Sequence, residues 1–197
     1  MIIYQIWNFL EINNCFIGEI FEPFTKLKKL EHISFQYDLL DESLMLWILS
    51  LNKLKYLNLS YSTWYSTRNY NFRNLTELEE LNLSNVAELF DEYGEELNLS
   101  NAYKYAEDLK LPLSLKNLNL SHHNYITDIH IKAISKLINL TNLNLSNCPQ
   151  LTDVTFKYIE CLTNLEHLNI SECPKFTLKS LEYLQTKLPN IFIQHSL

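Results

Sequence analysis

The chain has 197 residues, of which 47% are hydrophobic, and its formal net charge is -7. This size and composition allow one extended core to be buried, while the negative charge disfavours a nucleic-acid phosphate backbone as the partner. No segment reaches the ~18 apolar residues that span a bilayer, and the apolar start MIIYQIWNFLEI lacks the basic segment and the cleavage site of an export signal.

A short motif recurs along most of the chain. The sequence LNLS begins at Leu57, Leu81, Leu97, Leu118 and Leu143, returns as LNIS at Leu168, and in most copies follows a leucine by three residues. This pattern resembles the leucine-rich repeat, in which each L-x-x-L-x-L forms one strand of a shared sheet. The resemblance implies an α/β leucine-rich-repeat solenoid, curved, with a parallel β-sheet on its concave face and short helices and loops on its convex face.

The repeats can be aligned on their first leucine, which we call position one. The spacing is 23 to 25 residues except for a gap of 37 between Leu78 and Leu115. That gap holds a further copy at 94–101, so we expect an irregular additional coil there. We predict a single domain over residues 1–197 with eight or nine coils, irregular around 86–114. Position one falls at Trp7, Leu30, Leu54, Leu78, Leu115, Leu140, Leu165 and Leu188.

The segments that return from one strand to the next are predicted as short helices. Asp41 is expected to cap the first, Thr127 or Asp128 the second, and Thr152 or Asp153 the third. Segment 62–74 is expected to be a loop or a single turn. The residues predicted to face the core are Trp64 and Phe72 in that segment, Ile131, Ile134 and Leu137 in the second helix, and Val154, Phe156, Ile159 and Leu162 in the third.

Cysteine occupies position nine of three repeats, at Cys15, Cys148 and Cys173. With CPQLTDVTFKYIECLTNLEHLNISECP, this resembles the cysteine-containing subfamily of leucine-rich repeats. The resemblance implies the fold and binding mode of the substrate-binding domain of F-box/leucine-rich-repeat receptors in ubiquitin ligases or of mitotic-exit antagonists. Because the first repeat starts at Trp7, we expect no F-box in this sequence, and a substrate-recognition component or decoy of a ubiquitin ligase is the alternative function.

The cysteines also bear on chemistry and compartment. We expect buried, reduced thiols hydrogen-bonded to the turn backbone, with Cys161 in the core. The alternatives are a metal ion held by His123, Cys148 and Cys173, or a disulfide between the two cysteines. Neither zinc spacing nor a CxxC motif is present, so no metal or cofactor is predicted. Six of the eight N-x-S/T sequons lie in repeat strands, which disfavours glycosylation and favours the cytoplasm.

The concave face is expected to carry positions three, five and seven. Asparagine at position five and serine at position seven form uncharged columns, whose stacked side chains are expected to bond to one another. Specificity is expected where the columns vary. Position three runs Phe9, His32, Tyr56, Glu80, Asn117, Asn142, His167 and Asn190, and position eight runs Asn14, Tyr37, Tyr61, Asn85, His122, Asn147, Glu172 and His195.

Five aromatic residues of the first three coils are the predicted partner-binding site. Aromatic side chains bury large areas at low entropic cost, which makes them good interface anchors. The loop residues Tyr65, Arg68 and Tyr70 would extend this site, and the acidic run at 88–96 would favour a basic partner. The predicted site residues are Phe9, His32, Tyr37, Tyr56 and Tyr61.

The sequence therefore predicts a non-enzymatic scaffold that binds a protein partner on its concave face. No phosphate-binding glycine loop is possible with Gly18 and Gly94 as the only glycines. A GTPase-activating protein, acting through Arg68 or Arg73, is the remaining enzymatic alternative. Apolar ends would allow end-to-end self-association. The Asn, Ile, Lys and Tyr bias suggests a virus or an intracellular parasite, for which a decoy or adaptor in the host cytoplasm is expected.

Overall fold

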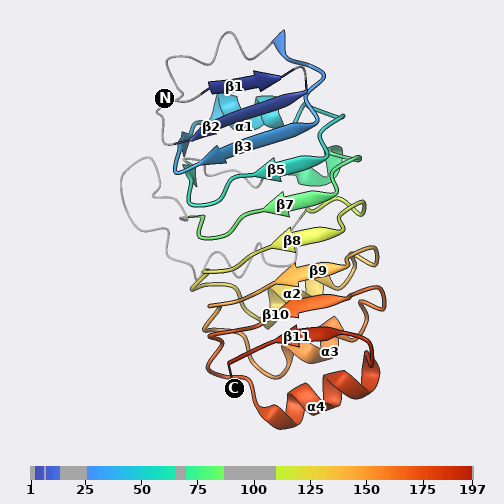
Figure 1. Ribbon diagram of the computed structural model, residues 1–197. Helices are drawn as coiled ribbons and strands as arrows, with labels where there is room; N and C mark the ends of the chain where they lie inside the picture. Colours follow the sequence, from blue (N-terminus) through green and yellow to red (C-terminus); the bar gives the residue numbers. More distant parts are fainter. Residues whose placement is uncertain (1–2, 7, 14–25, 65–69, 87–109, 197) are drawn as a thin grey trace.

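The computed structural model describes residues 3–6, 8–13, 26–64, 70–86 and 110–196. One sheet runs the length of the molecule, and the helices lie behind it (Figure 1). All neighbouring strands of this sheet are parallel except the first pair. Its strands, in spatial order, are β1 (Ile3–Ile6), β2 (Phe9–Asn13), β3 (His32–Gln36), β5 (Tyr56–Asn58), β7 (Glu80–Asn82), β8 (Asn117–Asn119), β9 (Asn142–Asn144), β10 (His167–Asn169) and β11 (Phe192–Gln194).

The return segments contain short elements on the other side of the sheet. A small second sheet pairs β4 (Leu39–Leu40) with β6 (Thr63–Trp64). The segment predicted to be a loop or one turn contains the 3-10 turn η2 (Phe72–Asn74), with Phe72 buried as expected. The helices are α1 (Glu42–Ile48), α2 (Asp128–Ile134), α3 (Thr155–Ile159) and α4 (Leu178–Lys187).

Leucines at positions one, four and six form the core, as the repeat predicts. In the third repeat, Leu54, Leu57 and Leu59 are all fully buried. The backbone fixes how successive coils stack, because the N–H groups of positions two and three share one carbonyl of the preceding coil. Lys55 N and Tyr56 N both donate to Glu31 O, at 2.8 and 3.0 Å. The α/β leucine-rich-repeat solenoid is therefore confirmed.

Two of the predicted helix starts are correct. The Asp41 carboxylate accepts a hydrogen bond of 2.8 Å from Leu44 N at the start of α1. Thr127 is the N-cap of α2, and its backbone N–H donates to His130 Nδ1 at 3.0 Å. Such bonds satisfy N–H groups that have no partner inside a helix.

The prediction for α3 is wrong in detail. The residue before the helix is Val154, which is exposed, and neither Thr152 nor Asp153 caps it. Asp153 instead accepts hydrogen bonds from Thr177 N at 2.9 Å and from the Ser180 hydroxyl. Although burial alone would raise its pKa, these bonds lower the pKa of the Asp153 carboxyl. The aspartate therefore stabilises the start of the next coil's helix rather than its own.

Two further expectations are corrected, and a third falls outside the described residues. Strand β7 pairs directly with β8, and the additional coil expected at 94–101 lies outside the described residues. Phe192, not Asn190, occupies position three of the last coil, because Phe192 pairs with His167. Cys161 is exposed rather than buried, since α3 ends at Ile159 and the chain turns away.

The N-terminal edge has a strand that the repeat pattern did not predict. Strand β1 pairs with β2 in the antiparallel direction, with Ile3 opposite Ile12. Figure 1 shows β1 at one end of the stack and α4 at the other. Within the described ranges, no helix combines the length and the apolar character needed to cross a membrane.

Candidate interaction surface

The asparagines at position five each form the same local hydrogen bond. The Oδ1 atom accepts the N–H of the serine two residues later at 3.0 Å in all five described repeats of this type, at Asn58, Asn82, Asn119, Asn144 and Asn169. The expected bonding of these amides to one another is therefore wrong. Because a backbone N–H can only donate, the Oδ1 atom is fixed and the Nδ2 donors are directed away from it.

Four of these amides, at Asn82, Asn119, Asn144 and Asn169, form the floor of a hollow of about 370 Å³ on the sheet face, which extends from β5 to β11. Its sides carry position-three residues that differ from coil to coil. In the middle, Asn142 Nδ2 donates to Asn117 Oδ1. Of the five predicted site residues, only Tyr56 lines this hollow. The other position-three residues that line it are Glu80, Asn117, Asn142, His167 and Phe192.

The predicted aromatic cluster is divided into two separate stacks. Phe9, His32 and Tyr56 stack in series along position three, with ring centroids 4.0 and 3.9 Å apart. Tyr37 and Tyr61 form a second pair, 4.7 Å apart. Five residues separate the two positions along each coil, which corresponds to roughly 16 Å in an extended chain. The five residues therefore provide two contact areas rather than one.

Position eight has an unusual backbone conformation. Its residues have positive φ in every described coil in which the turn is complete, at Tyr37, Tyr61, Asn85, His122, Asn147 and Glu172. Asparagine tolerates this left-handed region, whereas an ordinary side chain costs about 1–2 kcal/mol. The two tyrosines are also the most exposed of the predicted site residues, at 59% and 40%. They occupy positions that local conformational preference would give to asparagine.

Where position nine holds cysteine or serine in the described coils, its side chain donates to one carbonyl of the preceding coil. Cys148 Sγ donates to Leu120 O and Cys173 Sγ to Leu145 O, both at 3.2 Å. Ser62 Oγ makes the corresponding bond to Phe35 O at 3.0 Å. Burial raises the pKa of Cys148 to about 12. The prediction of buried, reduced thiols bonded to the backbone is therefore confirmed for these two cysteines, and the disulfide alternative is wrong.

His123 occupies the same position and makes the same kind of contact. Its Nε2 atom lies 2.6 Å from Leu83 O, and burial lowers its pKa. Serine, cysteine and histidine are thus alternative donors to the carbonyl of position six. The described residues contain no group of three or more His, Cys, Asp or Glu side chains that could hold a metal ion.

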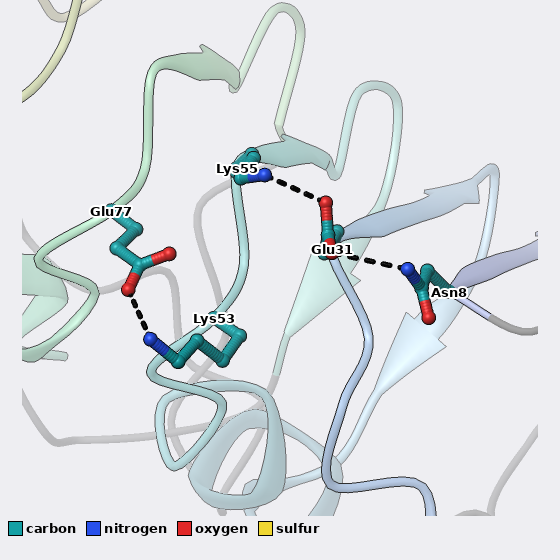
Figure 2. A network of polar contacts seen from close by, with 5 residues as sticks. All are labelled: Asn8, Glu31, Lys53, Lys55 and Glu77. Carbon is teal, nitrogen blue, oxygen red and sulfur yellow. Dashed lines mark hydrogen bonds and ion pairs between the residues drawn. The ribbon is translucent and has the colours of Figure 1, made fainter.

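Opposite charges alternate where the strands begin. Glu31 accepts hydrogen bonds from Lys55 Nζ at 2.8 Å and from Asn8 Nδ2 at 3.0 Å, and Lys53 pairs with Glu77 (Figure 2). The Glu31 hydrogen bond and charge raise the pKa of Lys55. These exposed pairs contribute little to stability, but they neutralise the charges of Lys53 and Lys55.

Several residues singled out in the sequence lie away from the hollow or outside the described residues. Tyr70, expected to extend the partner site, is half-buried and packs against the core. Arg73 is exposed in η2, on a return segment rather than on the sheet face. The remaining predictions on Trp7, Asn14, Cys15, Tyr65, Arg68 and the acidic run 88–96, and on the side chain of Trp64, lie outside the described residues.

Comparisons with known proteins support the repeat and the fold. A family model described as leucine-rich repeats (2 copies) matches residues 113–158. The structure of human 5T4 (Wnt-activated inhibitory factor 1, trophoblast glycoprotein) aligns with 96% of this chain and 76% of its own, with a TM-score of 0.60 and 19% identity. Internalin C2 from Listeria monocytogenes aligns with 88% of this chain, with a TM-score of 0.56 and 16% identity.

This chain spans 65% of the length of that internalin. A search of curated proteins found no match. The chain contains leucine-rich repeats and has the solenoid fold, and this architecture is generally used to present an extended concave surface to other proteins.

Proposed function

We propose that this chain is a non-enzymatic protein-interaction module whose partner binds in the hollow of the sheet. The observation that supports this most strongly is the contrast between the two columns of side chains that line the hollow. The floor is a column of identical asparagines, each held in place by a hydrogen bond to its own coil. The position-three residues beside it are aromatic, acidic, amide or imidazole in turn. A constant scaffold with varied contact residues is suited to specific recognition.

Blocking the hollow tests this proposal. Asn142→Trp would place a large ring in the middle of the hollow, and Val154→Trp would place the same ring at an exposed site on the return side. Partners captured by the tagged protein from cells would be compared between the two variants. We expect Asn142→Trp to lose the main partner and Val154→Trp to keep it. Equal capture by both variants would show that the partner binds elsewhere.

The two aromatic stacks are proposed as separate anchors. Tyr37→Asn combined with Tyr61→Asn removes the exposed pair and installs the residue best suited to positive φ. Tyr56→Ala removes the end of the other stack. We expect each change to weaken capture about tenfold or more, as for interface anchors in general. If removing one stack leaves partner capture unchanged, the binding site is restricted to the other stack.

A ligase substrate receptor is the alternative function. The observation in its favour is the repeated cysteine of position nine, whose thiols at Cys148 and Cys173 donate to the backbone, because this cysteine carried the resemblance to the ligase receptors. Affinity purification tests it directly. Recovery of cullin-ligase subunits would favour this alternative, and their consistent absence would reject it.

We further propose a reducing compartment, the cytoplasm of the cell or host, as the location. Cys148 and Cys173 are free thiols. Asn58 is buried and its Oδ1 atom is hydrogen-bonded, so a glycan at this sequon would disturb β5. Fractionation of expressing cells, with glycosidase treatment, would test this: a glycosylated, secreted product would contradict it. End-to-end self-association is proposed as well, and a sedimentation coefficient that does not change with concentration would exclude it.

A further inference from the structure

We infer that the end of the hollow formed by β5 and β7 is a binding site for an arginine side chain, presented by an extended peptide segment of the partner. This inference rests on the proposed function, and it specifies which chemistry the partner supplies. Tyr56 and Glu80 are directly opposite each other in the paired strands, and both line the hollow.

The stack of rings ends at this point. Phe9, His32 and Tyr56 follow one another at about one ring per strand, and the His32 and Tyr56 planes differ by only 2°. The next residue of the column is Glu80, which supplies a carboxylate in place of a ring. A group that enters the hollow here would therefore meet an aromatic ring and a carboxylate together.

The charges around this site favour a cation. Glu80 is exposed, and within the described residues the ion pairs of the neighbouring coils use Glu31, Glu77 and Glu79 instead. The Glu80 charge reaches Tyr56, where it adds to burial in raising the pKa of the phenol. Positions three, five and seven of the described strands contain no lysine or arginine.

His32 does not place a competing positive charge beside this site near neutral pH. Burial lowers the pKa of His32 below its ordinary value of 6.5, although the Glu11 charge acts in the other direction. The nearby Lys55 is paired with Glu31 at the beginning of the strands (Figure 2). The sheet face around Tyr56 therefore has carboxylates without a competing cation from the same columns.

Arginine fits this pair of groups better than lysine does. Its guanidinium is planar, so one face can stack on a ring while the edge donates two hydrogen bonds to a carboxylate. Ring and cation also attract each other through the quadrupole of the ring. A lysine ammonium would satisfy the charge but neither the stacking nor the paired hydrogen bonds.

The floor of the hollow indicates that the arginine belongs to an extended chain. The hydrogen bonds that the described structure gives the Asn82, Asn119, Asn144 and Asn169 side chains all use Oδ1. Their Nδ2 groups thus form a row of donors across adjacent strands, spaced roughly 4.8 Å apart. Carbonyl groups on one side of an extended peptide recur about every 7 Å, so a peptide crossing β7 to β10 would accept hydrogen bonds from some members of this row.

Random peptides displayed on phage provide a probe that assumes no partner. Selection on the wild-type protein is expected to enrich arginine at one position. A synthetic peptide from this pool would then be compared with versions that carry lysine or the neutral isostere citrulline at that position. We expect affinity to fall about tenfold or more with citrulline and by a smaller factor with lysine. Equal enrichment of arginine and other residues would overturn the inference.

Matched variants locate the site. Glu80→Gln should reduce affinity for the arginine peptide about tenfold and have little effect on the citrulline version. Glu79→Gln, one residue earlier and paired with Lys116, should leave both unchanged. If Asn142→Trp abolishes binding but Glu80→Gln does not, the proposed function stands and the arginine site is wrong. If neither substitution affects binding, both proposals fail.

Discussion

Removing the thiol donor at position nine should weaken the stacking of two coils. Cys148 is fully buried, and its Sγ atom donates to Leu120 O in the preceding coil at 3.2 Å. Cys148→Val keeps an apolar side chain of similar size but leaves that buried carbonyl without this donor. An unsatisfied buried acceptor costs about 1–3 kcal/mol. Because a thiol is a weak donor, we expect about 1 kcal/mol, near the lower limit.

Cys148→Ser is the matched control for this substitution. Serine already fills the position in the third repeat, where Ser62 Oγ donates to Phe35 O at 3.0 Å. The serine variant should therefore retain the bond and lose less stability than the valine variant. Urea unfolding followed by circular dichroism would give both values, provided that the slope with denaturant is unchanged. In thermal unfolding, 1 kcal/mol corresponds to a shift of about 2–4 °C for a domain of this size.

The reasoning would be refuted by either of two results. If Cys148→Val is as stable as the wild type, the donor contributes nothing. If Cys148→Ser is destabilised as much as Cys148→Val, then packing rather than hydrogen bonding explains the effect. A partial transition limited to a few coils would change the analysis, since repeat arrays can lose cooperativity.

Three further predictions follow from the same turns. Asn147 has φ of 53°, so Asn147→Ala should lose about 1 kcal/mol and Asn147→Gly clearly less; equal losses in urea unfolding would contradict this. Burial lowers the pKa of His123 below 6.5, so the unfolded state binds more protons as pH falls through 6.5. Stability should then decrease below that pH and do so less in His123→Asn; a parallel decrease in both proteins would argue against it. Iodoacetamide should label exposed Cys161 in the native protein but label buried Cys148 and Cys173 only on unfolding, as peptide mass mapping would show.

The repeat motif predicts the strands because the backbone hydrogen bonds between coils and the burial of the leucines recur at the same interval along the sequence. Each L-x-x-L-x-L places its fourth and sixth positions in the core, as Leu57 and Leu59 show. It fails in the last coil, where L-x-x-I-x-I from Leu188 fits the apolar pattern. There Phe192 N donates to Glu166 O, which shifts the strand by two residues. Apolar periodicity alone could not distinguish these registers, because Ile191 is buried in the turn as well.

The candidate site is harder to predict from the sequence than the strands are, for a different reason. The sequence groups Tyr56 with Tyr37 and Tyr61, because all three are aromatic residues of the first three coils. Which rings touch depends on position within the coil, so the structure separates them into two stacks. The burial predicted for Cys161 is wrong for a similar reason. That prediction extends the helical spacing beyond Ile159, where α3 ends, and Cys161 is exposed. Both errors arise where a turn changes the direction of the side chains.

The positive φ of Tyr37 and Tyr61 makes it possible to separate their role in recognition from their effect on stability. In the same turn, Asn85 and Asn147 adopt positive φ at little cost, whereas each tyrosine costs about 1 kcal/mol or more. Stacking of the two rings returns roughly 0.5–1.5 kcal/mol, which is less than the combined conformational cost of the two tyrosines, so the pair gives the fold no net stability. Replacing both by asparagine should therefore preserve stability. A loss of partner capture in that variant would then be a loss of recognition, because the fold has no net need for the rings.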